Sequence, residues 1–270
     1  MNRPEQAELS LKNRLFCCDC FALFPRIPPE TADLILTDPP YGIGYQNQFA
    51  RNRQKPISGD VSLDYRTLAK ECYRVLKPNR HAYFFTRFDT YPAHYRYLTE
   101  AGFQIKNCLV IEKANIGGIG DLKGSYASNS EWVIFCQKGR RTFQKTTLIK
   151  NHYPPGTVFH KGRAPSSEYK TRLNSCWFGR EYPKATYNAA WLSKRHIRHP
   201  TVKNVDCLSW LIQISTQPGE LIFDPFMGSG SAALAAIQTG RLYCGCEIDP
   251  DYCQLFERRK QEGGEHSCRS

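Results

Sequence analysis

Four consecutive residues, Asp38-Pro39-Pro40-Tyr41, combine a carboxylate, two prolines and an aromatic ring. They follow an apolar run, residues 34–37, that is typical of a β-strand, so they stand where that strand ends. The prolines lack backbone donors and favour an extended exit, which leaves carbonyl and carboxylate oxygens as acceptors beside the tyrosine. Acceptors next to a stacking surface suit a planar group with an exocyclic amino group. An ordinary Asp-Pro turn with a surface tyrosine is the simpler alternative.

A second segment, near the carboxyl terminus, is typical of a nucleotide-binding turn. A short apolar run leads into a turn that contains Gly228 and Gly230, and an alanine-rich helical stretch, residues 231–238, follows. Glycines let the backbone pass close to a ligand, and the start of a helix offers free N–H groups. Glu247 ends the next apolar run, about twenty positions on, where a carboxylate can accept both hydroxyls of a ribose. Asp224 opens the turn and suits a cationic ligand better than a pyrophosphate, although a plain strand–turn–helix remains the simpler alternative.

These two segments require a sheet built from strands that lie far apart in the sequence. Only a short stretch follows Glu247, so the remaining strands must lie upstream. The strand-like runs there are residues 15–18, 34–37, 82–85, 103–112 and 132–137, and the helix-like stretches are residues 63–76 and 90–101. We therefore predict an α/β fold, a Rossmann-like sheet with helices on both faces, whose cofactor-binding half comes last in the chain.

The positive charge of the chain is concentrated in one segment. The formal net charge is +12, and residues 138–198 contain 14 basic and two acidic residues, which account for the whole excess. Aromatic side chains alternate with the basic ones there, a pattern that favours nucleic acid over a merely solubilising surface. A polar stretch after Tyr41, residues 46–60, is either a DNA-closing loop or a simple surface loop. Candidate DNA contacts in the two stretches are Arg51, Arg53, Lys55, Lys161, Arg163, Lys170, Arg172 and Arg180.

Composition excludes several classes of protein. With 41% hydrophobic and 23% charged residues the 270-residue chain can bury a core, and no apolar run approaches the ~18 residues of a membrane span. Twelve cysteines are too few for a disulfide scaffold, and the charged amino terminus does not resemble a signal peptide, so reduced thiols in a cytoplasmic protein are expected. The pairs Cys17/Cys20 and Cys244/Cys246 lie in strand-like runs, and no metal site is expected.

Together these segments resemble the S-adenosylmethionine-dependent DNA amino-methyltransferases. Asp38-Pro39-Pro40-Tyr41 is similar to their catalytic motif and residues 224–230 to their cofactor motif. The order of catalytic motif, basic insert and cofactor motif is that of their β class. Further similar segments are residues 18–20, 74–78, 131–134, 199–203 and 240–241 together with Glu247, so the resemblance extends over most of the chain. Departures from the usual pattern, which bear on cofactor affinity, are Cys18 for Gly, Asn204 for Pro and Ser231 for Thr.

The resemblance implies a circularly permuted Rossmann-like methyltransferase sheet. It divides the chain into a catalytic half, residues 1–140, a target-recognition insert, residues 141–198, and a cofactor-binding half, residues 199–270. It further implies double-stranded DNA as the substrate and a kinship with restriction-modification methyltransferases. It leaves open whether a partner restriction enzyme exists and whether the chain is a monomer or a homodimer, and no membrane association is expected from the composition.

The resemblance also assigns site residues. Asp38, Pro39, Pro40 and Tyr41 are the candidate catalytic residues, with the Asp38 carboxylate and the Pro39 carbonyl accepting the hydrogens of the amino group. Asp19 is expected near the adenine of S-adenosylmethionine with Cys20 beside it, Glu247 at the ribose, and Lys203 at the methionine carboxylate. The remaining candidate cofactor residues are Asp224, Pro225, Phe226, Gly228, Ser229, Gly230 and Ser231.

Other functions remain to be weighed against adenine methylation. A cytosine amino-methyltransferase shares the chemistry, but in this family a serine in place of Asp38 more often accompanies cytosine. An RNA methyltransferase would use the same site. A nicotinamide oxidoreductase would explain the glycines but not residues 38–41 or the basic segment. An inactive nucleic-acid-binding relative is disfavoured because both motifs are intact.

Overall fold

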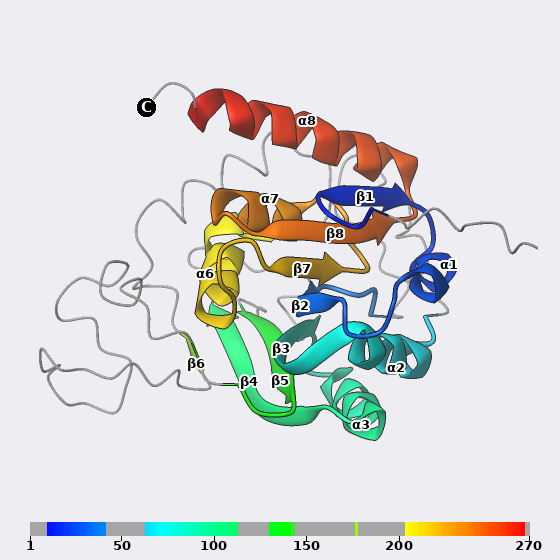
Figure 1. Cartoon of the computed structure of the whole chain (residues 1–270). Coiled ribbons are helices and arrows are strands. Elements are labelled where there is room, and N and C mark those ends of the chain that lie inside the picture. The colour runs from blue at the N-terminus through cyan, green and yellow to red at the C-terminus, as the bar shows by residue number, and fades with distance from the viewer. Residues whose placement is uncertain are drawn as a thin grey trace, which may run out of the picture.

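The computed structural model describes residues 10–41, 63–112, 130–141, 143, 176–177 and 203–267 (Figure 1). Within them an eight-stranded sheet has the order β1-β8-β7-β2-β3-β5-β4-β6. The strands are β1 (Arg14–Cys17), β2 (Ala32–Thr37), β3 (Leu76–Thr86), β4 (Gln104–Glu112), β5 (Ser130–Lys138), β6 (Cys176–Trp177), β7 (Leu221–Asp224) and β8 (Leu242–Glu247). The helices are α1 (Cys20–Leu23), the 3-10 turn η1 (Phe24–Arg26), α2 (Tyr65–Val75), α3 (Tyr91–Ala101), α6 (Val205–Ser215), α7 (Ser231–Gln238) and α8 (Pro250–Ser267).

The last two strands of the chain lie inside the sheet rather than at its edge. Strands β8 and β7 are inserted between β1 and β2, and all of these neighbours pair in parallel, as does β2 with β3 (Figure 1). Beyond β3 the sheet is mixed: β5 pairs antiparallel with both β3 and β4, and the short β6 pairs in parallel with β4. The carboxyl ends of β1, β8, β7 and β2 consequently meet at one edge of the sheet, where α/β proteins bind their ligands.

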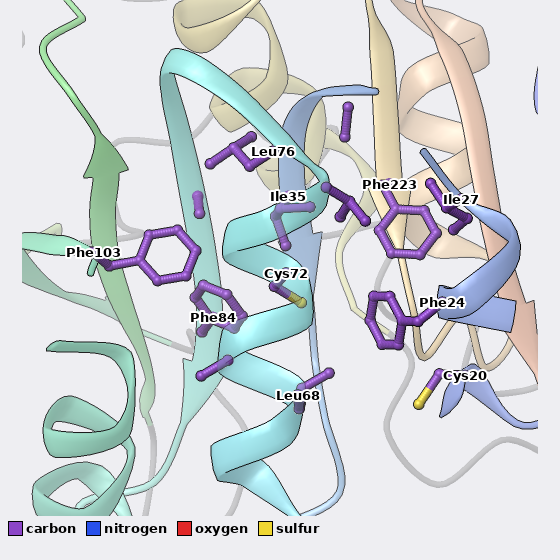
Figure 2. Packing of buried hydrophobic residues seen from close by; sticks show 14 of the residues in the cluster. Cys20, Phe24, Ile27, Ile35, Leu68, Cys72, Leu76, Phe84, Phe103 and Phe223 are labelled. Carbon is purple, nitrogen blue, oxygen red and sulfur yellow. The ribbon is translucent and has the colours of Figure 1, made fainter. Parts of the chain in front are cut away.

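Helices cover both faces of the sheet, as predicted. On one face α6, α7 and α8 pack on residues such as Leu34, Tyr83 and Ile222. On the other face α1, α2 and α3 enclose a second core, in which Cys72 of α2 lies near Ile35 and Phe84 (Figure 2). Strand β2 is buried throughout, because its alternate side chains enter the two cores. Burial on both faces explains why this segment has no polar alternation in the sequence.

The predicted strand-like and helix-like segments are found, most of them close to their expected bounds. The largest difference is in β3, which begins at Leu76, six residues before the predicted strand 82–85. Helix α2 ends at Val75 and β3 begins at Leu76, so no loop separates the two elements. Helix α6 was not predicted, because it is buried on most sides and so lacks the polar face that marks an amphipathic helix. Its start is set by Asn204, whose side-chain oxygen accepts a hydrogen bond from the Cys207 N–H at 3.0 Å.

An ionic cluster holds β2 against β7 near the amino ends of these two strands, opposite to the carboxyl edge of the sheet. Buried Asp33 accepts a hydrogen bond from the Leu221 N–H at 3.0 Å and binds the Lys77 ammonium at 2.9 Å. The Arg80 guanidinium bridges Asp33 and Glu220. This cluster holds the strand register that determines which residues meet at the carboxyl edge.

Two sets of predictions fall largely outside the described residues. The insert predicted for residues 141–198 is described only at residues 141, 143 and 176–177. None of the candidate DNA contacts, Arg51, Arg53, Lys55, Lys161, Arg163, Lys170, Arg172 and Arg180, is among the described residues. Across the part of the chain that is described, no helix has the length and apolar character that a membrane span requires.

Candidate active site

The two predicted motifs lie side by side although the sequence separates them widely. Strands β2 and β7 are direct neighbours, with Ile35 opposite Phe223. At their carboxyl ends the Thr37 hydroxyl donates a hydrogen bond to Asp224 Oδ1 at 2.8 Å, inside the protein. Residue 38 therefore leaves the sheet directly beside the turn that starts at Asp224. Strand β8 lies on the other side of β7, with Gly245 opposite Asp224, and ends at Glu247.

Asp38 is held in place by Tyr41. The Tyr41 hydroxyl donates a hydrogen bond to Asp38 Oδ1. Burial, together with the nearby Asp38 carboxylate, raises the pKa of Tyr41, so this hydroxyl stays protonated and remains a donor. Pro39 is buried and Pro40 is half-buried, so the segment leaves β2 in a fixed direction. The four candidate catalytic residues thus form one compact group at the end of β2.

Lys203 contacts Asp38 from a third segment of the chain. Its ammonium lies 2.9 Å from Asp38 Oδ2 and 3.2 Å from Glu131 Oε1, and 4.6 Å from the centre of the Phe85 ring. Burial alone would lower the pKa of Lys203, but the two carboxylates outweigh it and raise the pKa, so the side chain stays charged. The sequence placed Lys203 at the cofactor carboxylate, which stays a prediction. Glu131 was not predicted as a site residue, because no pattern in the sequence around it indicates that its carboxylate contacts Lys203.

The glycine turn folds tightly against β8 and α8. The Phe226 N–H donates to Asp224 Oδ1 at 3.0 Å, and the Met227 N–H donates to the Cys246 carbonyl at 2.9 Å. Gly228 and Gly230 have φ values of 51° and 79°, in the left-handed region that favours glycine. A Cβ at Gly230 would also lie 2.0 Å from the Phe256 ring. Gly230 is therefore required by both backbone conformation and packing.

We expect Gly230→Ala to lower the free energy of unfolding by about 2–5 kcal/mol, because the strain of a left-handed alanine adds to an overpacked core. Gly219→Ala is the matched control, since Gly219 has a similar φ of 82° but no heavy atom within 4 Å of its added Cβ. The control should lose only the conformational part, about 1–2 kcal/mol. Urea unfolding of the two variants measures the difference, and equal losses would show that the Phe256 contact is unimportant.

Asp224 ties the two motifs together from inside the protein. Its Oδ1 accepts both the Thr37 hydroxyl and the Phe226 N–H, and the side chain is buried. Burial raises the pKa of Asp224 to about 7, against the opposing effect of these two hydrogen bonds. Asp224 therefore has a clear structural role, and its predicted part in cofactor binding stays a prediction.

This raised pKa predicts a pH-dependent stability. Because the folded chain holds the Asp224 proton more tightly than the unfolded chain, whose aspartate has a pKa near ~3.9, the group favours folding most at low pH. That contribution is lost as the pH rises through about 7. Asp224→Asn keeps an oxygen acceptor but does not titrate. Between pH 5 and pH 8 its free energy of unfolding should therefore rise by about 2.6 kcal/mol relative to that of the wild type. Denaturant unfolding at both pH values measures this, and a difference that does not change with pH would contradict the assignment.

Glu247 presents its carboxylate at the end of β8. Oε2 accepts the Gly228 N–H at 2.8 Å and Oε1 accepts the Asp249 N–H at 2.9 Å. Burial raises the pKa of Glu247. Each carboxylate oxygen can accept a second hydrogen bond, so the pair suits two neighbouring hydroxyl groups. The predicted contact of Glu247 with the ribose stays a prediction.

Asp19 and Cys20 follow the neighbouring strand, β1, whose last residue Cys17 pairs with Glu247. Asp19 is exposed and caps α1, where its Oδ1 accepts the Phe21 N–H at 2.8 Å. Cys20 is buried in the core of Figure 2, and burial raises the pKa of its thiol to about 12. The Cys20 side chain thus packs as a neutral group, and the predicted cofactor contacts of both residues stay predictions.

An arginine that the sequence did not single out supports the glycine turn. Arg259 of α8 donates from one Nη to the Ser229 carbonyl at 2.6 Å and lies 2.9 Å from Ser229 Oγ and 3.3 Å from Ser231 Oγ. Burial lowers the pKa of Arg259 to about 10, a value at which it remains charged at neutral pH. Both serines thus have protein partners in this structure. Pro225 is also buried, and its carbonyl accepts the Cys246 thiol at 3.3 Å.

Comparison with known proteins gives consistent results. The family model described as DNA methylase matches residues 32–258. The DNA adenine methyltransferase YhdJ of Escherichia coli (strain K12) is 27% identical over 92% of this chain and 83% of its own length. The crystal structure of an M1.HpyAVI–SAM complex is similar with a TM-score of 0.58 and 18% identity, over 91% of this chain and 98% of that one. The cytosine-N4-specific PvuII DNA methyltransferase is similar with a TM-score of 0.63 and 16% identity, over 92% and 86%.

Proposed function

The chain belongs to the DNA methylase family and is an S-adenosylmethionine-dependent DNA methyltransferase, and we propose that it methylates the exocyclic amino nitrogen of adenine. The observation that carries the proposal is the pairing of β2 with β7, which places Asp38 beside the glycine turn. An acceptor for the amino group and a candidate cofactor site are thereby adjacent.

The residues at the carboxyl edge fit S-adenosylmethionine. The Glu247 carboxylate has acceptor capacity for the two ribose hydroxyls, and Gly228 lets the backbone lie close to a ligand. We assign Asp19 and Cys20 to the adenine end and the turn from Asp224 to Ser231, with Pro225, Phe226, Ser229 and Gly230, to the methionine end. Lys203 is kept as a candidate at the methionine carboxylate. When bound, S-adenosylmethionine supplies an electrophilic methyl group on a cationic sulfur.

Asp38 would activate the amino nitrogen of the target base. The lone pair of that nitrogen is delocalised into the ring, which makes it a weak nucleophile. Hydrogen bonds from the two amino hydrogens to the Asp38 carboxylate and the Pro39 carbonyl draw the lone pair out of the ring and orient it. The carboxylate also stabilises the positive charge that builds up on the nitrogen during methylation. Positioning and electrostatics are therefore the main sources of rate enhancement.

A base in duplex DNA must leave the stack to reach Asp38, at a cost of a few kcal/mol. Stacking on the Tyr41 ring would offset about 1–3 kcal/mol of this cost. The hydrogen bond from Tyr41 to Asp38 fixes that ring next to the acceptor. Contacts with the DNA backbone are assigned to the basic residues predicted from the sequence, Arg51, Arg53, Lys55, Lys161, Arg163, Lys170, Arg172 and Arg180.

Adenine is favoured over cytosine by the carboxylate at position 38, because a serine there more often accompanies cytosine in this family. The relative YhdJ, named as an adenine methyltransferase, supports the same choice. The cytosine-N4-specific PvuII structure keeps cytosine as the second candidate, since it has the same fold.

The test is to incubate the protein with methyl-labelled S-adenosylmethionine and unmethylated plasmid DNA, digest the DNA and identify the labelled nucleoside. We expect label in N(6)-methyldeoxyadenosine. Label in N(4)-methyldeoxycytidine would establish the second candidate. A parallel reaction offers RNA in place of DNA. Label that appears in RNA but not in DNA would show that DNA is not the substrate.

A further inference from the structure

Three charged side chains form a cluster around the candidate acceptor. Asp38 follows β2, Glu131 lies on β5 and Lys203 precedes α6, so three segments distant in the sequence each contribute one group. The Lys203 ammonium lies 2.9 Å from Asp38 and 3.2 Å from Glu131, and its side chain is only 10% exposed. Each of the two acids is 20% exposed. With both acids ionised, the cluster carries a net charge of −1.

The ammonium is located where it fixes the Asp38 carboxylate. Tyr41 occupies Oδ1 and Lys203 occupies Oδ2, so both oxygens are oriented by protein donors. A free carboxylate at a strand end would rotate about its side-chain bonds. With both oxygens held, the remaining lone pairs of Asp38 have defined directions, which is what recognition of an amino hydrogen requires.

A lysine beside Asp38 has an electrostatic disadvantage if it acts alone. At short range and low dielectric one ammonium would cancel much of the carboxylate charge, and with it the attraction for a nitrogen that becomes positive. Glu131 lies on the same ammonium and supplies a second negative charge. Lys203 can then hold Asp38 while the cluster as a whole stays negative.

We propose that Lys203 and Glu131 are positioning residues for methyl transfer: Lys203 orients Asp38, and Glu131 keeps the net charge of the group at −1. This inference rests on the proposed function, because it assigns these residues to the same reaction. If the cluster only joined β2, β5 and α6 mechanically, removing either partner would reduce stability without a dependence of the rate on net charge.

The experiment compares Glu131→Gln, Glu131→Asp, Lys203→Met and the double variant Lys203→Met/Glu131→Gln. Single-turnover methylation rates at saturating cofactor are measured together with cofactor affinity by calorimetry and with thermal unfolding. Glu131→Gln makes the cluster neutral and should lose at least about tenfold in rate, with cofactor affinity within about threefold of the wild type. Glu131→Asp keeps the charge and should stay within about fivefold of the wild-type rate.

The double variant makes the sharpest distinction. Lys203→Met leaves two carboxylates facing each other without a cation and should lose about a hundredfold in rate. Adding Glu131→Gln restores a net charge of −1, so the double variant should be at least about tenfold faster than Lys203→Met. The exposed pair Glu257→Gln/Lys260→Met on α8, whose charges are 3.4 Å apart, is the matched control and should keep the wild-type rate.

Two results would overturn the inference: a double variant no faster than Lys203→Met, or equal rates for Glu131→Gln and Glu131→Asp. If Lys203→Met does not fold, the comparison of Glu131→Gln with Glu131→Asp still tests whether the rate depends on the charge at position 131. A wild-type protein that transfers no methyl group to DNA would instead overturn the proposed function, which keeps the two failures distinguishable.

Discussion

Asp38→Ala is expected to lower the methyl-transfer rate by about a hundredfold to a thousandfold, while the affinity for the cofactor changes little. The substitution removes the acceptor that draws the amino lone pair out of the ring, but it leaves the glycine turn and Glu247 unchanged. It also removes the partner of Tyr41 and one of the two carboxylates on Lys203. Single-turnover assays with labelled cofactor measure the rate, and calorimetry measures the affinity.

A matched acidic control is Glu100→Ala. It removes an exposed carboxylate of α3 that lies 2.8 Å from the guanidinium of Arg66 on α2. That variant should methylate at the wild-type rate. If Asp38→Ala kept a tenth of the wild-type rate, Asp38 could not be the group that activates the amino nitrogen.

Glu247→Ala is expected to raise the dissociation constant of S-adenosylmethionine well over tenfold. Two ribose hydroxyls would lose their acceptor, and the N–H groups of Gly228 and Asp249, which now donate to this carboxylate, would lose their partner. Both losses act on binding, so the rate at saturating cofactor should fall much less than the affinity.

Glu247→Gln separates the two contributions. It preserves size and one acceptor oxygen, but its amide group would meet a backbone N–H with another donor. We expect an affinity between those of the wild type and Glu247→Ala. Calorimetric titration of the three proteins gives the order, and an unchanged affinity in Glu247→Ala would remove this residue from the cofactor site.

The meeting of the two motifs could be predicted because parallel strands present their carboxyl ends at one edge. Residues 34–37 and the short apolar run before Asp224 are each predicted as strands, and Asp38 and the glycine turn follow them directly. The sequence of the turn predicts a glycine at position 230. It does not reveal that the Phe256 ring also leaves no room for a side chain there.

The contacts that the sequence did not reveal join elements distant from each other in the chain. Glu131 approaches Lys203 because β5 runs antiparallel to β3, and Arg259 reaches the turn from α8. Such contacts depend on strand register and helix packing rather than on spacing. The circular permutation and the target-recognition insert stay predictions, since the basic segment that carries the insert lies almost entirely outside the described residues.

We propose that the carboxyl ends of β1, β8, β7 and β2 form one site for the methyl donor and its target, and a crystal structure with bound S-adenosylmethionine would show this directly. We expect the ribose hydroxyls on the Glu247 carboxylate and the methyl group on the side of Asp38. A cofactor bound elsewhere, for example in the groove between β1 and α8 lined by Leu15, Cys17 and Cys253, would contradict it.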